Sequence, residues 1–182
     1  MSSIPAQQVA AELRRRLPGV GVKKLHKLLY YCQGHHLATF DSPLFAESIS
    51  AWDMGPVVGG LWKWEKDNGV TTGTGITNEP ILNTVGYVVS RYGALTGSDL
   101  ERLTHSEDPW RNAGAHREKS GSARIPVGAL TDFFRANLSD DDQDPQPDPA
   151  QVQAWLSGAT DNQEPSAPDT FEGIRARARS NG

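Results

Sequence analysis

The chain has 182 residues, which allows one domain of ordinary size with an appendage but not two full domains. No run of 18 or more apolar residues occurs, so the sequence argues against a membrane-spanning helix or a membrane partner. The single cysteine, Cys32, excludes an intramolecular disulfide and a zinc site built on several thiolates. The basic cluster near the N-terminus follows the apolar residues, the reverse of a secretory signal, so we expect a cytoplasmic protein.

Charge and composition change sharply after residue 138. Residues 1–138 hold 15 Lys and Arg against 13 Asp and Glu, whereas residues 139–182 hold 3 against 9, so the two parts carry net charges near +2 and −6. Phosphate binding requires a concentrated basic surface, so these charges argue against nucleic acid as a partner. Five of the 12 prolines and few apolar side chains fall in residues 139–182. We therefore expect a helical domain over residues 1–138 and a largely disordered, acidic, Pro-rich tail with one or two short helix-forming segments.

Apolar spacing predicts two helices at the start of the chain. Val9, Leu13 and Leu17 recur every four residues as one stripe, and Pro18-Gly19 ends that helix. Apolar residues at spacings of three and four then predict the clearest helix, over about residues 22–40.

The middle of the chain predicts a short strand and two further helices. Residues 48–52 alternate weakly, as in a short strand, and Gly55-Pro56 predicts a turn followed by the first position of a helix that ends at Asn68-Gly69. The polar, glycine-punctuated residues 70–77 predict a loop. A 3.6-residue period then predicts a helix over residues 80–92.

The remaining elements follow from capping and turn signals. Thr96 and Asp99 predict a capping box, and Ser106 is placed to cap a further short helix. Residues 117–124 predict a loop, and a last helix follows over residues 125–138. The predicted fold is mainly α: a compact globular bundle of about six or seven short helices with at most a minor short β ribbon, followed by the disordered tail.

Histidine and cysteine side chains gather on the helix predicted over residues 22–40. His26, Cys32, His35 and His36 lack the H-x-x-x-H spacing that would bring two metal ligands together, so we expect no metal and no cofactor. His36 falls on the apolar face, where a hydrogen-bonded core histidine explains it, and Cys32 is expected to be a small core residue.

The string Thr104-His105-Ser106-Glu107 invites a catalytic interpretation. Ser106 and Glu107 fall where a helix N-cap and first turn are expected, and capping accounts for both. No G-x-S-x-G, His-Glu-x-x-His or Walker motif accompanies them. The sequence therefore favours a protein without enzymatic activity, and a hydrolase using His105, Glu107 and His36 is kept as an alternative.

Two tryptophans point to a binding surface. Trp62 and Trp64 are too close in sequence to share one helix face, so at least one should be partly exposed, and exposed tryptophan is enriched at binding hot spots. Lys23, Lys24 and Lys27 are expected to form a solvated face.

Four strings in order resemble a known domain: residues 24–45, 51–69, 91–113 and 125–134. The motifs K-L-x-K-L-L-Y-Y (24–31), A-W-x-x-G-P-V-V (51–58) and L-T-H-x-E-x-P-W (103–110) resemble the Panacea domain, the SocA-like antitoxin domain of bacterial and phage toxin–antitoxin systems. The resemblance covers residues 22–138. One departure is His35, where the family often has Trp.

The resemblance implies a non-enzymatic antitoxin that neutralises a cognate toxin by direct protein–protein binding. Candidate partner-binding residues are His35, Trp62, Trp64, Trp155 and Phe171. An adaptor that hands the toxin to a host protease is a variant of this hypothesis. A DNA-binding autorepressor that uses the helix over residues 22–40 is a third class, which the chain's net charge of −4 disfavours.

Overall fold

The structure, a computed structural model, describes residues 3–70, 72–73 and 75–141. Within these residues the chain forms seven helices: α1 Ala6–Arg16, α2 Val22–Phe40, α3 Gly59–Asn68, α4 Glu79–Tyr92, α5 Gly97–Ser106, α6 Asp108–Gly114 and α7 Val127–Asp141. A small sheet is formed by β1 Ile49–Trp52, β2 Gly55–Val58 and β3 Ala123–Arg124. The prediction of a mainly α fold with a minor β ribbon is confirmed. None of the helices in this part of the chain is long and apolar enough to cross a membrane.

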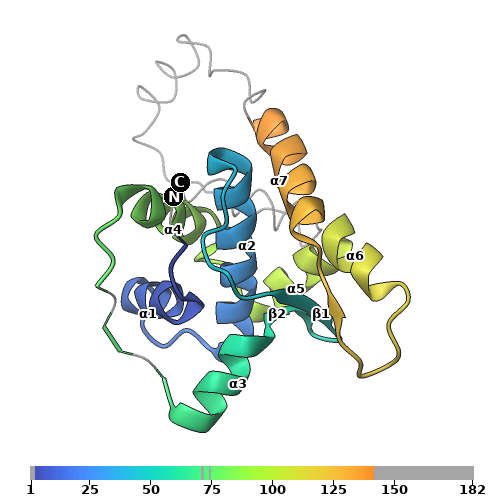
Figure 1. The fold of residues 1–182 in the computed structure, drawn as a ribbon, viewed down its shortest axis with the longest axis horizontal. Helices are drawn as coiled ribbons and strands as arrows, with labels where there is room; N and C mark the ends of the chain where they lie inside the picture. The colour runs from blue at the N-terminus through green and yellow to red at the C-terminus, as the bar shows by residue number, and fades with distance from the viewer. Residues whose placement is uncertain (1–2, 71, 74, 142–182) are drawn as a thin grey trace, which may run out of the picture.

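Helix α2 is the centre of the fold (Figure 1). It packs against α1, α4, α5, α7 and β2, so neighbours surround it on several sides. Thirteen of its 19 residues are buried, including polar ones such as Lys27, Gln33 and His35. Burial of these side chains sets the geometry of the site described below, because each must find an internal hydrogen-bond partner.

Local signals explain how the helices after the loop begin. Asn78 caps α4 by accepting from the backbone N–H of Ile81 at 3.3 Å. The predicted capping box is confirmed at α5, where Thr96 Oγ1 accepts from the Asp99 backbone N–H at 3.1 Å and Asp99 Oδ2 accepts from the Thr96 N–H at 3.0 Å.

The prediction that a helix starts at Gly55-Pro56 is wrong. These residues begin β2, which pairs antiparallel with β1 so that Ala51 lies opposite Pro56, and α3 begins only at Gly59. The strand order β2-β1-β3 places β2 at an edge, where the missing N–H of proline is tolerated. The end of the predicted loop 117–124 likewise forms β3, which pairs with the other side of β1.

The prediction that Ser106 caps a helix is also wrong. Ser106 is the last residue of α5, and its hydroxyl donates backward to the carbonyl of Leu103 at 2.7 Å. Glu107 occupies the N-cap position of α6 but makes no side-chain cap. The tail was expected to begin at residue 139, but α7 continues to Asp141; the other expectations for the tail, with Trp155 and Phe171, concern residues beyond the described part of the chain.

Candidate functional site

A buried carboxylate joins the first and third motifs. Glu107 is 7% exposed, and its two oxygens accept from the hydroxyls of Tyr30 and Tyr31 at 2.8 and 2.9 Å. Burial first, and then the nearby carboxylate, raise the pKa of both tyrosines, so the hydroxyls remain protonated donors. Glu107 therefore holds α2 against the α5–α6 junction, which corrects the capping interpretation of this residue.

A buried lysine joins the first and second motifs. Lys27 is 1% exposed, and its Nζ donates to the carbonyl oxygen of Pro56 at 3.3 Å. Burial lowers the pKa of Lys27 to about 8. The lysine passes close to Gly55, where a Cβ would lie 2.5 Å from Lys27 Cε and where φ is +101°. Glycine is needed at this point for both reasons.

The prediction of a solvated lysine face is therefore wrong for Lys27, and the two lysines before it also have internal partners. Lys23 forms an ion pair with Glu101, and Lys24 Nζ donates to the Gly93 carbonyl at 2.5 Å. The reason is that α2 is central, so its first turns pack against the end of α4 and against α5.

Further contacts join the second motif to the other two. The Trp110 indole N–H donates to the carbonyl oxygen of Trp52 at 3.1 Å, and His105 stacks on Trp110 with a ring separation of 3.9 Å. The backbone N–H of Val58 donates to His26 Nδ1 at 3.2 Å. The three motifs thus meet in one network of mainly buried contacts, which makes most of their polar residues structural.

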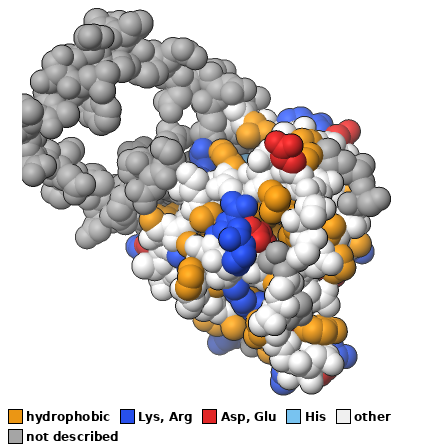
Figure 2. Space-filling view, turned by 90° about the vertical axis from the view of Figure 1, so that its left-hand side faces the viewer, with side chains coloured by type: hydrophobic (Ala, Val, Ile, Leu, Met, Phe, Trp, Pro, Cys, Tyr) orange, Lys and Arg blue, Asp and Glu red, His pale blue; other side chains and the backbone are white. Residues whose placement is uncertain are grey.

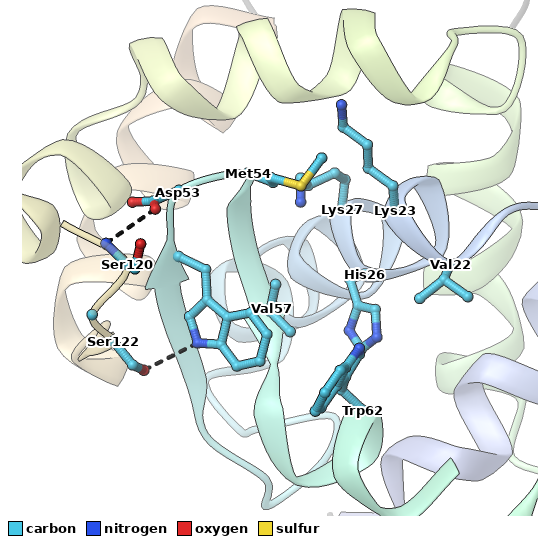
Figure 3. Close-up of a pocket in the computed structure, with 12 residues that line it drawn as sticks. Val22, Lys23, His26, Lys27, Asp53, Met54, Val57, Trp62, Ser120 and Ser122 are labelled. Atoms are coloured by element: carbon cyan, nitrogen blue, oxygen red, sulfur yellow. Dashed lines mark hydrogen bonds between the residues drawn. The ribbon is translucent and has the colours of Figure 1, made fainter. Parts of the chain in front are cut away.

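A cleft of about 450 Å³ opens beside this network. It lies between the start of α2, the β1–β2 hairpin, α3 and the loop before β3 (Figure 3), and it is lined by Val22, Lys23, His26, Lys27, Trp52, Asp53, Met54, Val57, Trp62, Ser120, Gly121 and Ser122. Its apolar residues Val22, Met54 and Trp62 are 54%, 56% and 37% exposed. We call this feature the hairpin cleft. Exposed apolar side chains around one hollow are the pattern of a binding surface.

The outer wall of the hairpin cleft is fixed by hydrogen bonds. Trp52 Nε1 donates to Ser122 Oγ at 3.0 Å, and the backbone N–H of Ser120 donates to Asp53 Oδ2 at 3.1 Å (Figure 3). Asp53 is also ion-paired with Arg117, and this contact is the main reason that its pKa is lowered. The hairpin and the loop before β3 are thereby held together, so the wall is preformed.

The candidate catalytic residues have separate partners. His36 Nδ1 lies 2.9 Å from Thr84 Oγ1, which confirms the prediction of a hydrogen-bonded core histidine, whereas His105 stacks on Trp110 and Glu107 is occupied by two tyrosines. Cys32 is fully buried, as predicted, and burial raises the pKa of its thiol. In the described residues no group of three His, Cys, Asp or Glu side chains could hold a metal ion. The arrangement is suited to binding.

The candidate partner-binding residues fall in different places. His35 is 6% exposed and lies 3.0 Å from the Tyr92 hydroxyl, with Phe134 packed edge-on against its ring. Trp62 and Trp64 are exposed on α3, as predicted for at least one of them, and Trp62 alone of the two lines the hairpin cleft. Trp155 and Phe171 lie outside the described residues.

Sequence reasoning missed Met54 and Val22 as surface residues. Met54 follows Asp53 in the two-residue connection between β1 and β2, and a large apolar residue at the tip of a hairpin is a signal that could have marked it. Val22 is the first residue of α2, and at the end of a helix the spacing of apolar residues does not show which side chains are buried. Neither residue could be assigned to a cleft without the tertiary contacts.

A second surface feature bears on nucleic-acid binding. On the face that carries α1, Lys and Arg side chains form a narrow band with hydrophobic side chains on either side (Figure 2). Helix α1 ends with three arginines, and all of them are paired: Arg14 with Glu65, and Arg15 and Arg16 with Glu12. The hydrogen bond that Arg15 donates to the Glu12 carboxylate is the main reason that the pKa of Glu12 falls to about 2. Arginines paired in this way offer little free charge to phosphates.

Comparison with known proteins gives a match to a family model. Residues 25–111 match the family model described as antitoxin SocA-like, Panacea domain, and they span the three motifs apart from Lys24. The match runs from α2 into α6, so the string 125–134 in α7 lies beyond it. No curated protein and no solved structure matches the chain. Residues 25–111 therefore resemble an antitoxin SocA-like Panacea domain, as the three motifs indicated.

Proposed function

We propose that this protein is an antitoxin of a bacterial or phage toxin–antitoxin system, which acts in the cytoplasm and neutralises a cognate toxin by direct protein–protein contact. The family match over residues 25–111 supports the antitoxin role. The observation that carries the binding mode is the hairpin cleft, where three of the exposed large apolar residues, Val22, Met54 and Trp62, surround one hollow. Interfaces concentrate their binding energy in such apolar anchors.

The proposed contact surface is the hairpin cleft, to which α3 contributes Trp62. Trp62 packs edge-on against Trp52, with 5.6 Å between the ring centres. The Nζ atom of Lys66 lies over the Trp62 ring, 5.1 Å from its centre. These contacts hold a large apolar ring in place before a partner arrives, which reduces the entropy lost on binding. Trp64 lies on the same helix but does not line the cleft, so it is outside this surface. His35 is buried, so we do not include it.

Binding without turnover is the second part of the proposal. A hydrolase would need His105 and Glu107 to face a common substrate position. Instead both Glu107 oxygens accept from tyrosines, and His105 stacks on Trp110. These hydrogen bonds and the ring stacking support a structural role for the third motif, and they give no support to the hydrolase alternative.

The test begins with co-expression. The product of the neighbouring gene should inhibit growth, this protein should restore growth, and the two should co-purify. Trp62→Ala should weaken the complex at least tenfold, whereas Trp64→Ala is a matched control: it lies on the same helix and is equally exposed, at 38% against 37%, but does not line the cleft.

Three outcomes would change the proposal. Failure to find a neutralised toxin removes the antitoxin function. Equal effects of the two tryptophan variants remove the cleft from the contact surface. Loss of rescue in a protease-deficient host, with the complex still formed, replaces neutralisation by the adaptor mechanism, in which a host protease is a further partner.

A further inference from the structure

The hairpin cleft contains a hydrogen-bond donor that the domain leaves unused. His26 is 2% exposed, and its Nδ1 accepts from the Val58 backbone N–H, so in the neutral ring the proton is on Nε2. His26 Nε2 is buried and has no hydrogen-bond partner within the described residues. Burial, with the neighbouring charge of Lys27, lowers the pKa of His26 to about 4, so the ring is neutral near pH 7. A buried N–H without an acceptor is unfavourable, and an acceptor from outside the domain would satisfy it.

Other polar groups of the cleft reinforce the need for an acceptor. Lys27 also lines it, and within the described residues its Nζ donates one hydrogen bond, 3.3 Å long, to Pro56, although an ammonium group can donate three. Among the described residues, Asp53 is the only carboxylate that lines the cleft, and its oxygens already accept from Arg117 and from the Ser120 backbone N–H. The walls around these donors are apolar. The cleft therefore fits a large apolar side chain next to a carboxylate.

The chain itself contains such a sequence after α7. Residues 169–174 read Asp-Thr-Phe-Glu-Gly-Ile, so Phe171 is followed directly by Glu172 and preceded two residues earlier by Asp169. Around the other tail aromatic, Trp155, the nearest acidic residues are Asp148 and Asp161, seven and six positions away. The net charges near −6 for residues 139–182 and +2 for residues 1–138 favour the same contact.

The chain is long enough to make this contact. Helix α7 has 15 residues, and at about 1.5 Å per residue its length is about 22 Å. Its first residue, Val127, follows the cleft residue Ser122 by five positions, which span at most about 18 Å. The end of α7 is thus within about 40 Å of the cleft wall, and the 30 residues from Asp141 to Phe171 span up to about 100 Å when extended.

We propose that in the free protein the segment 169–174 occupies the hairpin cleft of its own domain. Phe171 lies against the apolar walls formed by Met54, Val57 and Trp62, and the carboxylate of Glu172 accepts from His26 Nε2 and Lys27 Nζ. The segment then covers apolar surface that would otherwise face water. This contact does not depend on the toxin, and a toxin that docks on the same face has to displace the segment.

Disulfide trapping in the full chain tests the proposal. Cys32 is fully buried, so it should not form disulfides with engineered surface cysteines. One variant combines Ser120→Cys, an exposed residue that lines the cleft, with Thr170→Cys. The control combines Ala136→Cys, exposed on α7, with Thr170→Cys. Position 136 is nearer to position 170 in the chain, so a freely moving tail would cross-link it at least as readily as position 120.

The expected result is an intramolecular disulfide at least fivefold more abundant for the cleft pair than for the control pair. Phe171→Ala in the cleft pair should lower the yield to the control level. His26→Asn should do the same, because the Asn oxygen can still accept from the Val58 N–H but the shorter side chain places no donor at the position of His26 Nε2. Phe171 lies beyond the domain, so its variant decides the question even if His26→Asn impairs folding.

Any of three results would overturn the proposal: equal yields for the two pairs, a yield that Phe171→Ala leaves unchanged, or a disulfide found only between two copies of the chain.

Discussion

Substitution of Lys27 by Met should stabilise the protein near neutral pH. Lys27 is 1% exposed, and burial lowers its pKa from 10.5 to about 8, so its charged form is disfavoured by about 3 kcal/mol in the folded state. Methionine has a similar length and no charge. The substitution removes the hydrogen bond from Lys27 to the Pro56 carbonyl, which contributes about 1 kcal/mol. The free energy of unfolding should therefore rise by about 2 kcal/mol at pH 7.

The pH dependence gives a sharper check. Between pH 8 and 10.5 the unfolded chain still binds the Lys27 proton while the folded protein has lost it, so the wild-type protein gains stability as pH rises through this window. Lys27→Met lacks this gain. The advantage of the variant should disappear by pH 10.5, where only the lost hydrogen bond remains.

The assay is urea denaturation of both proteins at pH 7, 9 and 10.5, followed by far-UV circular dichroism. Tyr30, Tyr31 and the other titrating groups are common to both proteins, so their contributions largely cancel in the difference. Lys27→Arg is a control, since it keeps a charge that cannot be lost in this range and should be no more stable than wild type. A variant less stable than wild type at pH 7, or a difference that does not change with pH, would refute the reasoning.

Two further variants test the packing around α2. Glu107→Ala leaves two buried tyrosine hydroxyls without their acceptor and should lower the free energy of unfolding by about 2–5 kcal/mol; a loss below 1 kcal/mol in chemical denaturation would contradict the buried network. Gly34→Ala places a Cβ 2.2 Å from the Phe134 ring where α2 crosses α7 and should lower the free energy of unfolding by about 2 kcal/mol or more, whereas Gly128→Ala on α7 meets open space and should be neutral or stabilising by up to about 1 kcal/mol. Equal effects of the two alanines in thermal melts would show that the helices pack differently.

The helices could be predicted because their signals are local. The spacing of apolar residues gives α2 its observed bounds, and Thr96 and Asp99 form the capping box that their separation indicates. The same pattern could not show that Lys27 is buried. A stripe assigns one face to the core and the rest to solvent, but α2 has neighbours on several sides, so polar residues off the stripe are enclosed as well.

Two errors came from local rules that a nonlocal contact overrides. Gly55-Pro56 has the composition of a helix start, yet pairing with β1 makes it an edge strand. Glu107 has the position of a capping residue, yet its carboxylate is used by tyrosines 76 and 77 positions earlier in the chain. The hairpin cleft is assembled from four separate segments between Val22 and Ser122, so no spacing within one segment could reveal it.

The same residues that hold the motifs together also form the inner wall of the hairpin cleft. Lys27 donates to the Pro56 carbonyl oxygen, and His26 accepts from the Val58 backbone N–H. Both residues also line the cleft. A charge that costs about 3 kcal/mol of stability is not explained by folding alone, because a methionine would fill the same space. If the charge serves binding, Lys27→Met should raise stability and, in the chain with cysteines at positions 120 and 170, lower the yield of the intramolecular disulfide. Both changes in one variant would separate the binding role of Lys27 from its structural one, and a stabilised protein with an unchanged disulfide yield would leave the lysine without a part in the cleft.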